Sequence, residues 1–164
     1  MSVAIAINKI KEDEFIFKNE DIKKIDEKKL SIGFNVAFDW DIEKEDFFVR
    51  LTIHYTYDLN GSKIELVRFS TTTGFHVKGL KEILNIDGQK FQLPDFFMLT
   101  FVSTAVSSTR GMLSYKLSGT FLSDYYLPFV DPKDFLSHFK HELPKGKKAV
   151  SKKTATKKVA KKSK

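Results

Sequence analysis

The chain has 164 residues, 41% of them hydrophobic, a formal net charge of +7 and 16 phenylalanines. This length fits one domain plus a tail, and the apolar share is large enough to bury a core. The chain has no cysteine, which excludes disulfides, thiolate nucleophiles and cysteine-bound metals.

The positive charge is concentrated at the C-terminal end. Residues 140–164 hold eleven Lys and one Glu, about +10 with His neutral, so residues 1–139 carry +7 minus +10, or about −3. From residue 145 on, no side chain is aromatic and none is a larger hydrophobe than valine. We therefore expect a folded domain over 1–139 and a disordered basic tail over 140–164. Such a tail either attracts phosphate or an acidic partner, or only aids solubility.

No membrane insertion is expected from the sequence. The N-terminal apolar run is broken by Asn8 and Lys9, so we expect no signal peptide. No stretch of about 18 apolar residues occurs that would span a bilayer. The expected location is the cytoplasm.

The first half of the chain shows the period of two that is typical of strands. Residues 3–10 and 15–17 are short candidates, and 18–29 are expected to form a loop with a helical turn. Two longer patterns follow, joined by an acidic turn; their apolar members are Ile32, Phe34, Val36, Phe38 and Trp40, and then Phe47, Val49, Leu51, Ile53, Tyr55 and Tyr57. Asn60-Gly61 indicates a hairpin into a further strand, from Ile64 to about Val77.

A long helix is expected after a connection over 79–92, which holds a short helical turn at 80–84. Pro94 suits its first turn. Its apolar side chains form two adjoining rows: Phe97, Phe101, Ala105 and Met112, and Val102, Val106, Thr109 and Leu113. The helix ends either near Gly111 or near Gly119. Asp131-Pro132 predicts the start of a short second helix.

Strands first and helices last favour the α+β class over alternating βαβ units. The expected fold is a four-stranded antiparallel sheet packed by one long helix and a short second helix.

The loop after the long helix carries more aromatic side chains than a connection needs: Phe121, Tyr125, Tyr126 and Phe129. Two interpretations stay open. The aromatics fill the core, or some of them form an exposed apolar surface for a partner.

Catalytic and metal sites are not expected. Gly111 and Gly119 are isolated, so no phosphate-binding loop is present, and no serine stands in a nucleophile motif. His138 and His141 share a helix face but lack a third ligand. An acidic cluster fits a solvated turn better than a cation site, because it lacks the EF-hand spacing; its members are Asp39, Asp41, Glu43, Glu45 and Asp46. We expect no enzyme, no cofactor and no metal.

Six segments between residues 4 and 138 stand in a fixed order: IAINKIKEDEFIFKNE, KLSIGFNVAFDW, FFVRLTIHYTY, LVRFSTTTGFHVKGL, LPDFFMLTFVSTAVSSTRG and SGTFLSDYYLPFVDPKDFL. This order resembles the SecB family of protein-export chaperones and its SecB-like relatives. The segments are similar to that family's first strand, its three-strand meander, its long helix and the loop into its second helix.

The resemblance implies a homotetramer, a dimer of dimers, that holds unfolded or precursor polypeptides without ATP. Clients would lie in apolar grooves between the sheet and the layer of helix and loop. The groove candidates in this chain are Phe38, Trp40, Phe97, Phe101, Phe121, Tyr125, Tyr126 and Phe129.

The charge pattern departs from that of export-type members, whose acidic C-terminus and acidic sheet positions dock onto the translocation motor. Here one acidic position is kept as Glu14, two others fall on Lys18 and Arg68, and the tail is basic. Opposite charges weaken or redirect such docking. A chaperone is therefore expected, for export or for one dedicated partner such as an antitoxin.

Two alternatives from other classes stay open. One is a nucleic-acid- or ribosome-associated protein that acts through the Lys-rich tail. The other is a domain that binds a fatty ligand, although no polar anchor in the sequence points to one.

Overall fold

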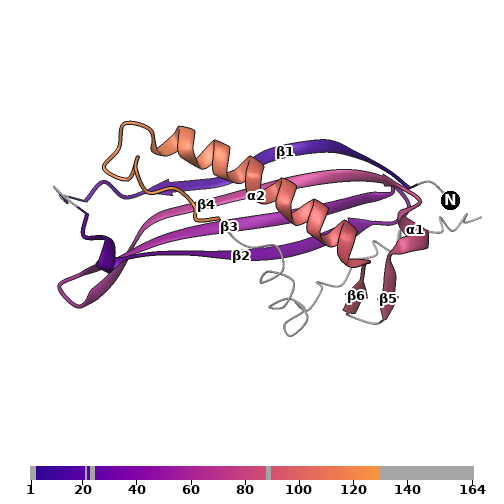
Figure 1. Cartoon of the computed structure of the whole chain (residues 1–164), viewed down its shortest axis with the longest axis horizontal. Helices are drawn as coiled ribbons and strands as arrows, with labels where there is room; N and C mark the ends of the chain where they lie inside the picture. Colours follow the sequence, from indigo (N-terminus) through magenta and orange to yellow (C-terminus); the bar gives the residue numbers. More distant parts are fainter. Residues whose placement is uncertain (1–2, 21, 23–24, 88–89, 130–164) are drawn as a thin grey trace, which may run out of the picture.

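The computed structural model describes residues 3–20, 22, 25–87 and 90–129. The elements run in the order β1 (Ala4–Phe17), the 3-10 turn η1 (Glu27–Lys29), β2 (Leu30–Asp41), β3 (Asp46–Leu59), β4 (Ser62–Lys78), α1 (Leu80–Ile83), β5 (Asn85–Asp87), β6 (Lys90–Gln92) and α2 (Asp95–Leu117). One sheet forms a layer, and α2 lies across one of its faces (Figure 1). The predicted second helix from Asp131, His138 and His141, and the basic tail lie outside the described residues.

The main sheet has four antiparallel strands in the order β1-β4-β3-β2. The meander β2-β3-β4 and the α+β class are confirmed. Residues 3–17 were expected to form two short strands, and that expectation is wrong. β1 is one strand of 14 residues, because bulges between Ile7 and Lys9 and between Glu12 and Glu14 let the pairing continue through the charged stretch.

The hairpin between β3 and β4 turns at Asn60-Gly61. Both residues have positive φ, 54° and 85°, and Leu59 pairs with Ser62 across the turn. A two-residue turn of this kind matches the twist of the flanking strands, and Asn-Gly adopts it with little strain. The sequence-based prediction of this hairpin is confirmed.

The connection over 79–92 is more ordered than its sequence indicates. It contains α1, as expected, and also a small hairpin of β5 and β6, which was not expected. Three residues per strand are too few for a periodic pattern. The hairpin brings Phe91, 6% exposed, against the rings of Phe38, Trp40 and Phe47.

The core lies between α2 and the sheet. The ring of Phe101 sits 5.1 Å from that of Phe47 on β3 and 4.6 Å from that of Phe75 on β4. Seven residues of α2 are buried: Met98, Phe101, Val102, Ala105, Thr109, Leu113 and Leu117. They confirm most of the two predicted rows, although Phe97, Val106 and Met112 are only half-buried. Ser118 and Gly119, with φ +76°, end the helix, while Gly111 lies inside it.

α2 crosses the sheet diagonally, from β2 and β3 at its first residues to β1 and β4 at its last (Figure 1). At the far end, Lys116 bonds Glu12 on β1 at 2.9 Å. A diagonal helix leaves two corners of the sheet without helical cover. The loop of residues 118–129 folds back over one corner, near the ends of β2 and β3 (Figure 1). At the other corner, Ile5, Ile7 and Ile10 of β1 remain 37–51% exposed.

The opposite face of the sheet is polar, because residues alternate sides along each strand. Thr52 bonds Ser70 at 2.9 Å, and Glu65 bonds both His54 and Arg68 at 2.7 Å. No helix in the described part of the chain is long and apolar enough to cross a membrane.

Candidate functional site

The two candidates on β2, Phe38 and Trp40, are half-buried at the edge of the sheet. Their rings lie 5.5 Å and 4.9 Å from the ring of Phe91. They point to the same side of the sheet as α2, because they pair with Val49 and Phe47, which belong to the core. One part of each ring therefore packs on the core while another part is accessible.

The two candidates on α2 differ. Phe101 is 0% exposed, so the expectation that it contacts a client is wrong: it is a core residue held between both central strands. Phe97 is half-buried beside it. Phe96, which the sequence analysis passed over because it lies off the apolar rows, is 70% exposed with its ring 5.5 Å from that of Phe97.

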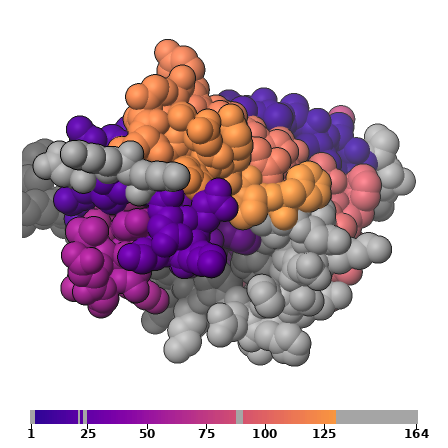
Figure 2. Space-filling model, turned by 60° about the vertical axis from the view of Figure 1, so that its left-hand side comes forward, coloured from indigo at the N-terminus to yellow at the C-terminus, as the bar shows by residue number. Residues whose placement is uncertain are grey.

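The loop of residues 118–129 uses its apolar side chains in two ways. Leu122 and Leu127 are buried, at 0% and 4% exposure, and fasten the loop to the core. Tyr126 and Phe129 are 61% and 84% exposed. The two leucines, and none of the four loop aromatics, are therefore the buried residues of the loop. Figure 2 shows the loop and the end of α2 (orange) projecting from the surface.

The other two loop aromatics are half-buried. The ring of Phe121 lies 5.6 Å from that of Phe17 on β1. Tyr125 lies near η1: partial desolvation first, and then the negative charge of Glu27, raise the pKa of its hydroxyl.

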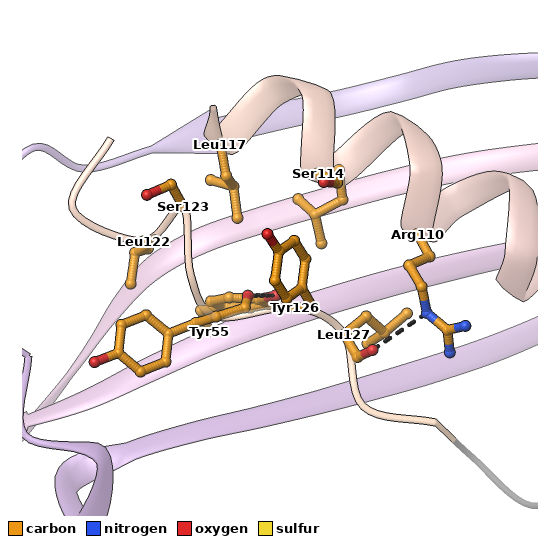
Figure 3. Close-up of a pocket in the computed structure, with 10 residues that line it drawn as sticks. Tyr55, Arg110, Ser114, Leu117, Leu122, Ser123, Tyr126 and Leu127 are labelled. Carbon is orange, nitrogen blue, oxygen red and sulfur yellow. Dashed lines mark hydrogen bonds between the residues drawn. The ribbon is translucent and has the colours of Figure 1, made fainter. Parts of the chain in front are cut away.

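Two side chains that the sequence analysis missed hold the loop in place (Figure 3). The hydroxyl of Tyr55 donates to the main-chain oxygen of Tyr125 at 2.7 Å. Burial raises the pKa of Tyr55 to about 12, so it stays a donor at neutral pH. Arg110 donates from Nε to the oxygen of Leu127 at 3.2 Å and from Nη2 to that of Pro128 at 3.1 Å. The one available signal was that Arg110 is the only basic residue in 91–115.

A small cavity lies where α2, β3 and the loop meet, with Tyr55, Arg110 and Tyr126 in its wall (Figure 3). Its volume is about 10 Å³, which is room for about one water molecule. This cavity does not take an organic ligand, so the fatty-ligand alternative finds no support there. The structure brings the aromatic candidates together in two groups. Phe38, Trp40 and Phe97 pack against one core cluster, and Phe121 and Tyr125 pack against the other.

Comparisons with models of protein families and with curated sequences find no match. Among solved structures, the chain is similar to a SecB-like chaperone of Mycobacterium tuberculosis in complex with a ChAD peptide from the HigA1 antitoxin. The similarity covers 77% of this chain and 91% of that chain, with a TM-score of 0.54 and 12% sequence identity. The fold is SecB-like. At this identity the likeness concerns the fold alone.

The polar face of the sheet, on the side away from α2, carries both negatively and positively charged side chains. Glu14 is exposed on β1, opposite Ser70 on β4. Arg68 is paired with Glu65, and hydrogen bonds from His54 and then from Arg68 lower the pKa of that carboxyl.

The acidic turn of the SecB-like fold, between β2 and β3, spreads its carboxylates over separate partners. Asp41 bonds Lys44, Glu45 accepts from the main-chain nitrogen of Gly79, and Asp46 bonds Asn8. Within the described ranges, no group of three metal-ligating side chains comes together.

Proposed function

We propose that this protein is an ATP-independent chaperone, a holdase, that binds unfolded polypeptides. The observation that carries the proposal is a set of accessible aromatic side chains on a SecB-like support. We call this set the aromatic surface; it consists of Phe38, Trp40, Phe96, Phe97, Phe121, Tyr125, Tyr126 and Phe129. Large aromatic rings bind many apolar segments through contact area, with little demand on their sequence. No catalytic group is needed.

The edge strand β2 adds a second means of binding. Its 12 residues pair with β3 in one unbroken register, and in the described chain no strand pairs with its outer side. An edge strand with a regular register can pair with an extended client segment as a further strand. The bulges of β1 make the opposite edge a poorer template.

The size of the effect fits a holding function. A client segment that covers about 600 Å² of apolar surface gains roughly 15 kcal/mol. The entropy lost when the client is ordered and bound offsets about half of this free-energy gain or more. The expected dissociation constant is about micromolar. Such binding holds a client in the cytoplasm and still releases it without ATP.

The proposed assembly is a homotetramer. The exposed Ile5, Ile7 and Ile10 support contacts between subunits, since a contiguous apolar strip is costly to leave in water. A solution mass near four times 18.9 kDa, measured by light scattering after size exclusion, is the expected result. A monomer would contradict the assembly.

Two kinds of client fit the proposal, precursors for export and one dedicated protein. The similar mycobacterial chaperone is bound to an antitoxin peptide, which supports a dedicated client of that kind. Isothermal titration with single peptides distinguishes the two: a dedicated client binds at least tenfold more tightly than unrelated apolar peptides. Glu14 keeps one acidic position of export-type members, but the basic residues Lys18 and Arg68 at two others speak against docking onto an export motor.

The test of the holdase is suppression of aggregation. Chemically denatured citrate synthase is diluted into buffer with the full-length protein, and light scattering is followed. We expect a delayed rise at about stoichiometric tetramer. The double variant Tyr126→Ser/Phe129→Ser should lose most of the delay. Tyr115→Ser is the matched control, because Tyr115 is 83% exposed on α2 but outside the aromatic surface. A wild-type protein that neither delays aggregation nor slows refolding contradicts the proposal.

The Lys-rich tail supports a second candidate function, binding to nucleic acid or the ribosome. Its eleven Lys in residues 140–164 would displace counterions from phosphates. We expect RNA binding that falls steeply with salt and disappears when 140–164 are deleted. Holdase activity that survives the same deletion would show that the two functions are separate.

A further inference from the structure

Arg110 reaches from α2 to three consecutive residues of the loop. Its Nε and Nη2 donate to the main-chain oxygens of Leu127 and Pro128, and its guanidinium lies 5.5 Å from the centre of the Phe129 ring. Leu127 is buried, but Pro128 and Phe129 are exposed. The loop therefore leaves the core after Leu127, and the side chain of Arg110 contacts the loop at that point.

These contacts have different physical roles. A charged donor makes a stronger hydrogen bond to a carbonyl than a neutral one does, and the planar fork of arginine serves two neighbouring carbonyls at once. The third contact holds an aromatic ring by its face. An 84% exposed ring would otherwise sample several rotamers, and a client would have to order it on binding.

We propose that Arg110 is the positioning residue of the aromatic surface: it aims Phe129, and through the main chain of residues 127–128 the neighbouring Tyr126, outward in a conformation ready for an apolar segment. Arg110 acts through these two rings. This inference rests on the proposed holdase function, and deepens it by naming the residue that sets the affinity of the loop.

Other anchors hold the rest of the loop. Leu122 and Leu127 pack in the core, and Tyr55 bonds the carbonyl of Tyr125. Loss of Arg110 should therefore leave the loop attached and release mainly residues 127–129. This separates a positioning role from a structural one.

The probe is fluorescently labelled, reduced and carboxymethylated α-lactalbumin, which stays unfolded in buffer. Its dissociation constant for the full-length protein is measured by fluorescence anisotropy. Arg110→Met should weaken binding about tenfold, since a pre-ordered ring and two charged hydrogen bonds are lost. Arg110→Lys keeps the charge over the ring but not the fork, and should weaken binding only about threefold.

A double-mutant cycle tests whether Arg110 acts through Phe129. Phe129→Ala alone should weaken binding about fivefold, because it deletes a contact ring. In the Arg110→Met background the same change should cost less than twofold, because the ring is no longer aimed. Phe129 is exposed, so Phe129→Ala should fold normally. Its affinity for the probe can be measured whether or not Arg110→Met is stable.

Lys116→Met is the matched control. Lys116 also lies on α2 and also has its charge over a ring, 5.2 Å from the centre of Phe15, but it bonds Glu12 on β1 and not the loop. Its dissociation constant should stay within twofold of wild type. If the loss of positive charge from α2 were the cause, Lys116→Met and Arg110→Met would lower the affinity for the probe equally. That result would overturn the inference.

The remaining outcomes are distinct. A wild-type protein that does not bind the probe overturns the holdase and this inference together. If wild type and Arg110→Met bind the probe equally, or if the losses in the cycle are additive, the role of Arg110 is overturned. The holdase proposal is not affected by either result. Amide exchange gives a readout besides affinity: in Arg110→Met the amide of Tyr125, bonded to Leu122 at 3.0 Å, should keep its wild-type rate, which shows that the rest of the loop stays attached.

Discussion

The hydroxyl of Tyr55, on β3, donates a 2.7 Å hydrogen bond to the main-chain oxygen of Tyr125, 70 residues further along the chain. Tyr55 is 0% exposed, and its bond joins the central part of the sheet to an irregular loop. A loop carbonyl that faces the core has no ladder to satisfy it, and an unpaired one is costly. The phenol supplies the missing donor.

Tyr55→Phe should therefore loosen the loop without disrupting the core. The change keeps the ring and removes one hydrogen bond, which leaves the oxygen of Tyr125 unpaired, at a cost of about 1–3 kcal/mol. Chemical denaturation measures the loss, and faster exchange at the amide of Tyr125 locates it. Tyr115→Phe, at an exposed phenol, should change nothing. A Tyr55→Phe variant as stable as wild type would mean that the bond is not formed in solution.

The same phenol predicts a pH dependence at the alkaline end. Burial raises the pKa of Tyr55 from its usual value near 10 to about 12, so the folded state keeps a proton that the unfolded state loses. The stabilisation from this group is fully present below about pH 10 and is lost as pH rises through about 12. Wild type should therefore lose more stability than Tyr55→Phe between pH 9.5 and 11.5 when urea melts are compared. Parallel losses in both proteins would contradict this assignment.

Phe101 and Phe96 should respond oppositely to truncation, although both are phenylalanines of α2. Phe101→Ala removes a ring that packs between Phe47 and Phe75, and should cost about 3–5 kcal/mol. Phe96→Ala removes a ring that is 70% exposed, and should change stability by less than about 0.5 kcal/mol. Denaturant midpoints compare the two. A small loss for Phe101→Ala would place α2 elsewhere on the sheet.

The buried pair Thr71 and Thr109 predicts an asymmetry. The hydroxyl of Thr109 donates to the main-chain oxygen of Ala105 at 2.7 Å, so Thr71 must be the donor in the 2.6 Å bond between the two hydroxyls. Thr109→Val leaves the hydroxyl of Thr71 unpaired in the core and should cost about 1–3 kcal/mol. Thr71→Val leaves Thr109 with its bond to Ala105, and should cost less than about 1 kcal/mol. Equal losses would mean that the donor assignment is wrong.

Thr73 offers a stabilising change. It is 0% exposed and faces the core from β4, and its Oγ1 has no hydrogen-bond partner among the residues that the structure describes. Desolvating a hydroxyl without a partner costs about 1–3 kcal/mol. Thr73→Val keeps the shape and removes the hydroxyl, so the thermal midpoint should rise. Thr52→Val is the contrasting change, because Thr52 bonds Ser70, and it should not raise the midpoint. A lower midpoint for Thr73→Val would indicate a bound water at that hydroxyl.

The sequence by itself determined the elements with strong local signals. Alternation defined β2 and β3, Asn60-Gly61 placed the hairpin, and the helical rows placed α2, because each pattern depends on neighbours along the chain. It also showed an excess of aromatics in residues 118–129.

Only the tertiary structure decided which of those aromatics are accessible. Phe101 and Phe97 share a helical row, yet the diagonal crossing of α2 buries the first and leaves the second at the margin. Exposure depends on what lies above a residue in space, and periodicity does not contain that information. For the same reason the hairpin of β5 and β6, and the roles of Tyr55 and Arg110 as donors to the loop, could not be read from the sequence. Main-chain carbonyls are the same at every position, so the choice of which ones a side chain meets is made only when α2, the sheet and the loop pack together.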